Sequence, residues 1–536
     1  MMSRGWVSLA VLIAASVLRA EEYPLSPEMA LLERDTASAD YRATLPPMLV
    51  TDLAAEWQRA VNPDDAMNFA EGHGGIDKVL ADSRLKAAYE RRDRIGKNFL
   101  AVMRGEYERR KLKAPFDQEG AVTLTAPKGS GRSVAGAGDL SVVHPNDEAA
   151  HQWYRFRGPS GQGTVDDPNV PIRWSATENI VWKTRLPGRG NSSPVIWNDR
   201  IFLTFADDKG TVRSMLCVDR DSGQVRWRRD LKVETIERMV RDKNGFASAT
   251  PAVDGKQAYV FFGNLGVVCF DFEGNQKWRT DLGKFDGTWG PGASTILYKD
   301  LVILNQDQSR PSASLTVALD RNNGSVVWRE DRPASMGWCT PMVFSVAEAG
   351  RDEMIFASNE RLLGVDPATG KGLWSCAGPT REPIPSVVMG NGLIFGTSGR
   401  NGPTLAVRPG GEGDVTGSRL VWSVLRGGPH VPSPALAAGR IFLINDHGIL
   451  TCLDATSGAT ILQRRMGGKF SASPIVAGNR IYLSNEDGLT TVIRTDGDLD
   501  VVAENKLGEP ILASFATADG RFFIRAPQTL YCVGGK

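Results

Sequence analysis

The chain has 536 residues, with 57 Gly, 30 Pro and 13 Trp, a composition typical of a turn-rich β protein rather than a helical one. Its 63 Lys and Arg residues balance 62 Asp and Glu residues, which leaves a formal net charge of +1. A chain so balanced has no overall field that attracts nucleic acid or an anionic membrane surface, so we expect no nucleic-acid partner.

The first twenty residues predict an export signal. Arg4 supplies a short positive region, residues 6–18 are mostly apolar, and Ala20 suits a cleavage site. The apolar run is too short to span a membrane comfortably, and no Cys lies near the expected cleavage point. We therefore expect residues 1–20 to be a signal peptide. The mature chain is expected to be a monomer without a transmembrane segment, in the periplasm or cell envelope or secreted.

Residues 21–126 differ in character from the rest of the chain. Leu85, Tyr89, Phe99 and Met103 recur at helical spacing within a strongly charged stretch, which predicts a small helical region. A following run rich in Gly, Ser and Ala predicts a flexible linker over 127–150. Residues 151–536 then form the third predicted part, an array of repeats.

The repeat reads small-x-Asp-x-x-x-Gly-x-x-x-Trp and is clearest at 217–227, 318–328 and 364–374. A fixed period of this size indicates a series of equal supersecondary units. Asp and Gly close a tight turn, and Trp fills the space between neighbouring sheets, so these residues are interpreted as structural. The motif residues are Trp182, Asp219, Gly223, Trp227, Asp271, Trp278, Asp320, Gly324, Trp328, Asp366, Gly370, Trp374, Trp422 and Asp454.

Short apolar strands separated by Gly, Asn and Asp turns predict four-stranded antiparallel blades. Seven whole units begin near residues 192, 248, 290, 339, 386, 433 and 473, and three more strands follow. The strand at 179–184 is expected to complete the last of them. The fold class is therefore all-β, an eight-bladed β-propeller, with seven blades as the alternative.

Four of the six cysteines, Cys217, Cys269, Cys452 and Cys532, occupy the same small-residue position in different units. Equivalent positions in neighbouring sheets are about 10 Å apart, too far for a disulfide. We therefore interpret these four as buried small hydrophobic residues.

The repeat resembles that of the quinoprotein-like (PQQ-repeat) β-propeller family. The phrase at 154–159, followed by Trp174-Ser175 and Trp182-Lys183, is similar to the opening segment of exported bacterial members. The resemblance covers about 70% of the chain. It is nearer to outer-membrane assembly propellers than to dehydrogenases that bind pyrroloquinoline quinone (PQQ). Two features of those enzymes, adjacent cysteines and Cys-x-x-Cys-His, are absent from this sequence.

Loops that precede each blade, and loops between second and third strands, are expected to meet at one end of the central channel. Two Trp, two Phe and a His there would form a stacking surface for a sugar or planar cofactor, or would instead plug the channel. Asp307 or Asp446 suits a cation ligand or a base with His430 or His447, although the same residues suit ordinary turns. The candidate binding residues are Arg189, Asn191, Phe246, Trp289, Asp307, Arg310, Trp338, Glu382, Arg400, His430, Asp446, His447 and Phe470.

Two functions follow from different classes. The first is a non-catalytic binding or scaffold protein for a protein or glycan partner of the cell envelope, with no catalytic residue and no cofactor. The alternative is a PQQ- and Ca²⁺-dependent oxidoreductase, similar to alcohol or sugar dehydrogenases, with Trp289 or Trp338 stacked on the quinone. A blocked channel favours the first function, and an acid–base pair beside a flat aromatic floor favours the second. We expect the first.

Overall fold

The computed structural model describes residues 123–125, 140–165, 167, 169–237, 239, 243–285, 287–309, 314–334 and 336–534. The chain divides into two compact units, residues 1–120 and 121–536, and all described residues belong to the second. The predicted signal peptide and nearly all of the predicted helical region lie outside the described residues. Within the described part, no helix has the length and apolar character needed to cross a membrane.

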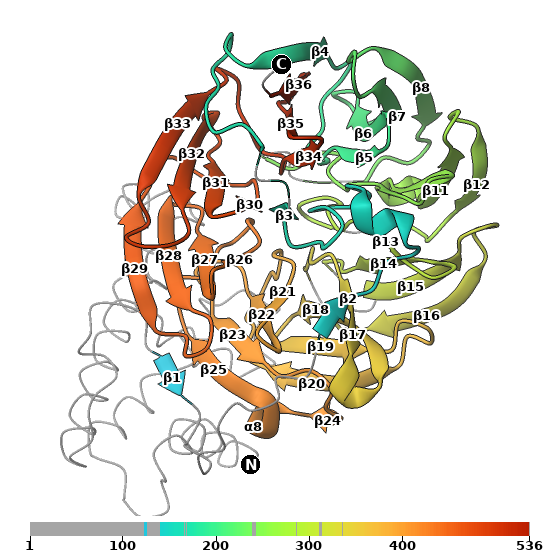
Figure 1. Ribbon diagram of the computed structural model, residues 1–536. Helices are drawn as coiled ribbons and strands as arrows, with labels where there is room; N and C mark the ends of the chain where they lie inside the picture. The colour runs from blue at the N-terminus through green and yellow to red at the C-terminus, as the bar shows by residue number, and fades with distance from the viewer. Residues whose placement is uncertain are drawn as a thin grey trace, which may run out of the picture. The chain divides into compact units, whose positions relative to one another are not determined.

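Eight sheets, each with a core of four antiparallel strands, are arranged in a ring (Figure 1). This confirms the eight-bladed propeller predicted from the repeat. The strands are short and apolar, and most are bounded by tight turns. Each sheet buries both faces against its neighbours, and this is why the middle strands are almost continuously buried.

The first four blades follow one another along the chain. Blade 1 contains β5 (Val195–Trp197), β6 (Arg200–Ala206), β7 (Val212–Asp219) and β8 (Val225–Lys232). Blade 2 contains β9 (Ala252–Val253), β10 (Gln257–Phe261), β11 (Val267–Asp271) and β12 (Gln276–Thr280). Blade 3 contains β13 (Ile296–Tyr298), β14 (Leu301–Gln306), β15 (Ser314–Asp320) and β16 (Val326–Arg332). Blade 4 contains β17 (Met342–Val346), β18 (Arg351–Ser358), β19 (Arg361–Val365) and β20 (Gly372–Ala377).

The other four blades complete the ring. Blade 5 contains β21 (Val388–Gly390), β22 (Leu393–Thr397), β23 (Thr404–Val407) and β25 (Leu420–Val424). Blade 6 contains β26 (Ala435–Ala437), β27 (Arg440–Ile444), β28 (Ile449–Asp454) and β29 (Thr460–Arg465). Blade 7 contains β30 (Ile475–Ala477), β31 (Arg480–Ser484), β32 (Leu489–Arg494) and β33 (Val501–Lys506). Blade 8 contains β34 (Ala516–Ala518), β35 (Arg521–Arg525), β36 (Thr529–Val533) and β4 (Ile180–Arg185).

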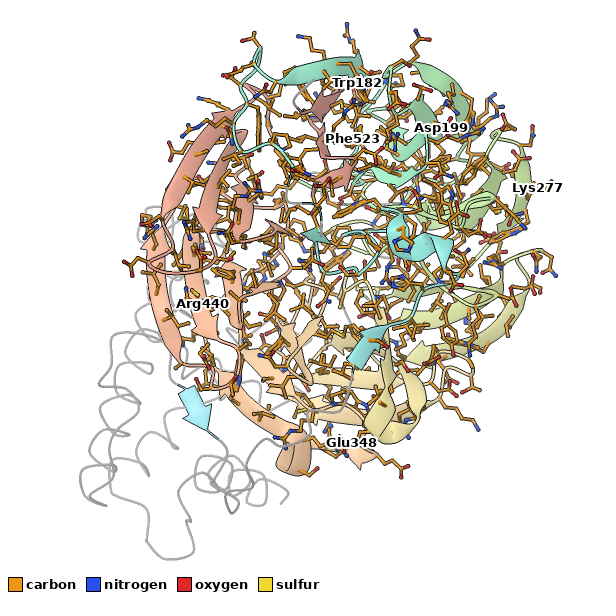
Figure 2. The ribbon with its side chains drawn as sticks, in the orientation of Figure 1. Trp182, Asp199, Lys277, Glu348, Arg440 and Phe523 are labelled. Carbon is orange, nitrogen blue, oxygen red and sulfur yellow. The ribbon has the colours of Figure 1, made fainter. Side chains whose placement is uncertain are left out.

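Blade 8 joins the two ends of the repeat array. Its outer strand β4 precedes blade 1 in the sequence, yet it pairs with β36, where Cys532 lies opposite Trp182 (Figure 1). Trp182 also packs beside Phe523 of β35, with ring centroids 6.0 Å apart (Figure 2). Opening the ring therefore requires breaking a hydrogen-bonded sheet, not merely a side-chain contact.

The small residue of the repeat lies directly opposite the Trp on the next strand. Cys217 pairs with Trp227 and Ala318 with Trp328, and in both blades the register shifts immediately afterwards. All six cysteines are buried and free, which confirms the interpretation of the four motif cysteines. In blade 7 the residue opposite Val492 is Ala503.

The Trp of one blade docks on the Asp-x-x-x-Gly turn of the next, a contact that we call the tryptophan–glycine joint. Trp182 Nε1 donates to the Arg220 carbonyl at 3.0 Å, and Gly223 has a φ of +72° and lies against the Trp182 ring. A side chain at Gly223 would be strained and would overlap the indole. The same donation joins Trp227 to Phe272, Trp278 to Arg321, Trp328 to Pro367 and Trp422 to Ala455.

The joint between blades 4 and 5 differs from these. Trp374 Nε1 donates to the Glu353 carboxylate of its own blade at 2.7 Å, and the same carboxylate accepts from Gly410 N of blade 5 at 3.2 Å. Arg351 holds the other carboxylate oxygen at 2.9 Å. A fully buried Glu thus replaces the backbone carbonyl that accepts from Trp at the other joints.

Several short segments extend the blades. β1 (Thr123–Thr125) pairs with β25, β2 (Leu140–Val142) with β17, and β3 (Thr164–Val165) with β30. β24 (Gly413–Asp414) pairs with β20, next to the one-turn helix α8 (Thr416–Arg419). The 3₁₀ turns are η3 (Glu148–His151), η4 (Gly263–Leu265) and η6 (Ala347–Ala349). β2 and most of η3 fall within residues 127–150, for which a flexible linker was predicted.

Candidate functional site

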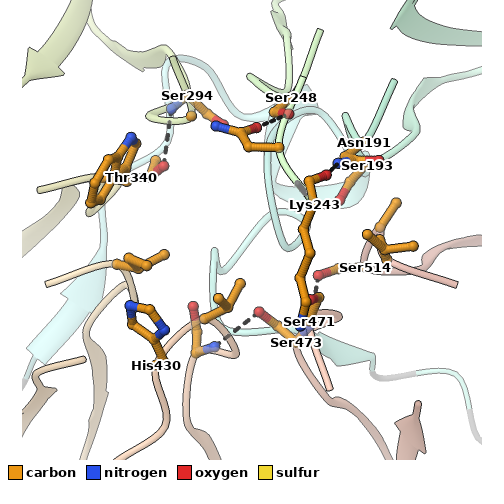
Figure 3. A pocket seen from close by; sticks show the side chains of 18 of the residues that line it. Asn191, Ser193, Lys243, Ser248, Ser294, Thr340, His430, Ser471, Ser473 and Ser514 are labelled. Carbon is orange, nitrogen blue, oxygen red and sulfur yellow. Dashed lines mark hydrogen bonds between the residues drawn. The ribbon is translucent and has the colours of Figure 1, made fainter. Parts of the chain in front are cut away.

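A cavity of about 430 Å³ opens at the end of the channel where the chain enters each blade (Figure 3). All eight blades, or the loops that lead into them, surround it. Its wall consists of short Ser/Thr phrases that precede the innermost strands, and its rim consists of charged and aromatic side chains from longer loops. The volume of this cavity is typical of small-molecule sites, which range from about 300 to 1,000 Å³.

Residues 153–165, which we call the crossing segment, run across the channel beneath the cavity. The Trp153 and Tyr154 carbonyls accept from Ile196 N and Val253 N at 2.7 and 2.9 Å, and the Gly163 carbonyl accepts from Val476 N at 2.8 Å. These bonds satisfy the free edges of innermost strands, which otherwise lack partners. Phe156 of this segment lines the cavity, so the segment forms part of the base of a cup.

A ring of hydroxyl groups surrounds this base. Each blade contributes one Ser or Thr just before its innermost strand: Ser193, Thr250, Ser294, Thr340, Ser386, Ser433, Ser473 and Ser514. In six of the links around the ring, the backbone N–H of one residue donates to the hydroxyl oxygen of the next at 2.9–3.1 Å. Ser386 instead donates its hydroxyl to the Thr340 carbonyl at 3.0 Å. All of these residues except Ser386 line the cavity.

On one side of the rim, His430 stands between two carboxylates. Its Nδ1 lies 3.3 Å from Asp446 and its Nε2 lies 3.5 Å from Glu382, which also accepts from Arg400 at 2.5 Å. Burial lowers the pKa of His430, but Asp446 and Glu382 outweigh it, so this pKa lies above its ordinary value. Burial raises the pKa of Glu382, but His430 and Arg400 outweigh burial and hold that pKa below its ordinary value.

On the opposite side, Lys243 reaches across the mouth of the cavity. Its ammonium lies 2.6 Å from Glu486 of blade 7, although Lys243 belongs to the loop between blades 1 and 2. Ser471 donates to the same Glu486 oxygen at 2.6 Å, and Asn191 holds the Lys243 carbonyl at 2.7 Å. Figure 3 shows Lys243 extending from the side of Asn191 towards Ser471 and Ser473.

Two tryptophans form an aromatic part of the wall. Trp338 is almost buried, and its Nε1 donates to the Gly290 carbonyl at 2.8 Å. Trp289 is 36% exposed, and its carbonyl accepts from Asn244 at 2.6 Å. The indole of Trp338 is therefore positioned before any ligand arrives, whereas at Trp289 the hydrogen bond holds the backbone only.

The structure brings together seven of the predicted binding residues around the cavity: Asn191, Trp289, Trp338, Glu382, Arg400, His430 and Asp446. Five others do not line it. Arg189 is exposed beside Asp208, and His447 lies in an exposed turn. Phe246 and Phe470 are buried, the first beneath the Arg213 guanidinium and the second in the core of blades 6 and 7. Arg310 lies outside the described residues.

Asp307 is the fifth predicted residue that does not line the cavity. It is buried and paired with Arg332, which also donates to Asn305. Burial raises the pKa of Asp307, with Arg332 acting in the opposite direction. The side chain therefore belongs to an internal ion pair of blade 3, not to the cavity.

Sequence reasoning did not identify Lys243, Phe156 or the hydroxyl ring. The ring had a signal, because Ser-Pro or Thr-Pro recurs where most blades begin. Those phrases indicated the starts of strands, but not that their hydroxyls face one channel. Lys243 had no signal, because the carboxylate that its ammonium meets belongs to a residue 243 positions away in the sequence.

Comparison with known proteins places the chain in a family. A family model described as outer membrane protein assembly factor BamB matches residues 209–402 and 411–532, more than half of the chain. The chain belongs to this family. A BamB from Alkalilimnicola ehrlichii is 30% identical over 187 residues, which cover 33% of this chain and 43% of that relative. This chain thus matches less than half the length of that BamB.

Solved structures share the fold. A quinohemoprotein alcohol dehydrogenase from Comamonas testosteroni is 12% identical, with a TM-score of 0.54, covering 73% of this chain and 82% of its own. BamB from Moraxella catarrhalis is 14% identical, with a TM-score of 0.49, covering 67% of this chain and 97% of its own. At such identities the likeness to the dehydrogenase shows the propeller fold alone.

The carboxylates around the cavity are already paired, which disfavours a Ca²⁺ site among them. Ca²⁺ takes six or more oxygen ligands, usually including several carboxylates. Glu382, Asp446 and Glu486 each already face a cationic group of the protein. Among the residues that the structure describes, no group of three or more His, Cys, Asp or Glu side chains is arranged to hold a metal ion.

Proposed function

We propose that this chain is a non-catalytic binding protein of the cell envelope, which holds a protein or glycan partner at the mouth of the cavity. The observation that carries the proposal is the family match, which extends over most of the propeller. The name of that family, outer membrane protein assembly factor, agrees with an envelope role. The apolar stretch within residues 1–20 supports export.

The cavity has a feature of each function: His430 meets Asp446 in a site lined by two tryptophans, as expected of the oxidoreductase, whereas its base and its paired charges favour binding. The crossing segment lies across the channel at the base of the cavity. A general base needs a lone pair free to accept a substrate proton. Lys243 is paired with Glu486 and is not free for that role, and His430 stands between two carboxylates.

Site-specific photo-crosslinking in the native host tests the proposal. A photoreactive residue replaces Lys469, which is exposed on the rim two residues before Ser471. The matched control replaces Lys277, which is exposed on outer strand β12 (Figure 2). We expect a crosslinked partner from position 469 and none from position 277.

A titration with quinone tests the alternative function, an oxidoreductase. Purified protein is mixed with PQQ and Ca²⁺, and dye reduction is followed with a panel of alcohols. Saturable binding with dye reduction, lost in Trp338→Ala, would replace the binding function with an oxidoreductase. Equal crosslinking from positions 469 and 277 would show that the mouth of the cavity is not the binding surface.

A further inference from the structure

The charged side chains that line the cavity each face a group of opposite charge. Lys243, Arg400 and His430 face Glu486, Glu382 and Asp446, at distances between 2.5 and 3.5 Å. A charged ligand would have to displace one of these partners or enter unpaired, and both cost free energy. An uncharged ligand leaves every pair in place. The electrostatics therefore favour a neutral ligand.

The hydroxyl ring supplies hydrogen-bond donors, which indicates a polar ligand. The seven ring residues that line the cavity have hydroxyl oxygens, and six of these accept a backbone N–H. None of the seven donates its hydroxyl hydrogen to a group of the described part of the chain. Accepting an N–H polarises a hydroxyl and makes it a stronger donor. A ligand rich in oxygen would satisfy several of these hydroxyls at once.

The aromatic side chains require that the ligand also has an apolar face. Trp289 and Trp338 stand on one wall and Phe156 at the base, while Ile384 and Leu512 lie between polar groups. Trp289 still exposes 36% of its surface, so a flat ligand face has room to cover it. Aromatic side chains stack on such faces, and the Trp338 ring, held by its indole N–H, loses little conformational freedom in doing so.

Together these features describe a sugar ring, which is uncharged, carries hydroxyls around its edge and has an apolar face of C–H groups. We propose that the cavity binds an uncharged saccharide with a size of one or two rings. The saccharide is either a free oligosaccharide or the exposed end of an envelope glycan, since both present the same chemistry. The inference rests on the proposed binding function and narrows its ligand. A peptide fits less well, because its charged end would meet the paired groups of the rim.

Calorimetric titration of the purified protein tests this proposal. The probes are maltose, cellobiose and N,N′-diacetylchitobiose, with glucuronic acid as a charged comparison. We expect at least one uncharged probe to bind and glucuronic acid to bind more weakly. Trp289→Ala should weaken binding by about tenfold, and Trp289→Phe, which keeps an aromatic face, by less than about threefold. Val326→Ala, another exposed apolar truncation on outer strand β16, should leave binding unchanged.

A second arm distinguishes the two sources of the sugar. The protein is sedimented with an insoluble polysaccharide fraction of the host envelope, with and without the best disaccharide. Cosedimentation that the disaccharide inhibits identifies a glycan end, and disaccharide binding without cosedimentation identifies a free oligosaccharide. Both results support the saccharide site.

Three results would contradict the saccharide site. If no uncharged probe binds, or if glucuronic acid binds more tightly than the uncharged sugars, the saccharide site is wrong. Binding that Trp289→Ala and Val326→Ala reduce equally would also overturn it. If the probes fail while position 469 still crosslinks a partner, only this inference fails and the proposed binding function stands.

Discussion

Two sets of contacts hold neighbouring blades together, and they differ in kind. At the outer strands, one contact recurs, because five tryptophans donate to a backbone carbonyl in the next blade. At the cavity mouth, each contact occurs once: Lys243 meets Glu486, and His430 meets Glu382 and Asp446. The repeat therefore builds the ring, whereas residues that depart from the repeat build most of the site.

The hydroxyl ring lies between these extremes. A ring Ser or Thr occurs in every blade, and the Trp of the repeat occurs in most blades. Unlike the tryptophans, however, the ring residues except Ser386 line the cavity. A repeated structural element thus also supplies ligand-facing groups. The unusual joint at Trp374 shows the reverse case, in which a single buried carboxylate, Glu353, replaces a repeated backbone acceptor.

Removing the tryptophan of an outer joint should reduce the stability of the fold most. Trp422 is 1% exposed and packs against Gly458 of the next blade. Trp422→Ala should lower the free energy of unfolding by about 3–5 kcal/mol, because it leaves a large cavity between blades 5 and 6. Trp289→Ala at the mouth should lower it by less than about 1 kcal/mol. Urea denaturation of the variants measures both, and equal losses would refute the distinction between the two sets of contacts.

A second prediction concerns the other half of the joint. Gly324 has a φ of +75°, and a Cβ there would lie 2.5 Å from the Trp278 ring. Gly324→Ala should cost about 1–3 kcal/mol, from backbone strain and overpacking together. The control is Gly372→Ala, where a Cβ would meet nothing within 4 Å. Thermal denaturation of the two variants should separate them, and a harmless Gly324→Ala would show that the joint tolerates a side chain.

Most of the propeller was predictable from the sequence because its determinants recur. The spacing of the tryptophans, the Asp and Gly turns and the alternating strands all indicated four-stranded blades, and the count of eight is confirmed. The additional strand β24 had no such signal. It lies in an insertion within blade 5 and pairs with the edge of blade 4, so its partner is not its neighbour in the repeat.

The site was predictable only in part, for a related reason. The rule that loops before each blade meet at one end located Trp289, Trp338, Glu382 and His430. The same rule failed for Phe246 and Phe470, because a residue beside the mouth can turn into the core instead. Which pairs of charges meet depends on loop conformation, and no periodic pattern in the sequence records it.

The contribution of His430 to stability should be small and should depend on pH. Since the pKa of His430 is raised when the chain is folded, its bridge contributes stability that is complete below the ordinary His pKa of about 6.5. That contribution is lost as the pH rises through the folded pKa. Glu382 works in the opposite sense, because its lowered pKa makes its contribution fall only in acid. Asp446 and Arg400 are the other charged groups that face this pair.

His430→Gln should therefore destabilise the protein by about 0.5–1 kcal/mol at pH 6, the size expected of a partly exposed ion pair, and by less at pH 9. Urea denaturation across this range measures the difference. His447→Gln is the matched control, because His447 is exposed on the next turn of the same blade and forms no ion pair with a described residue. A difference between His430→Gln and wild type that stays constant with pH would show that His430 packs between its carboxylates without being charged. The saccharide site would then lose one of the cations that balance its rim.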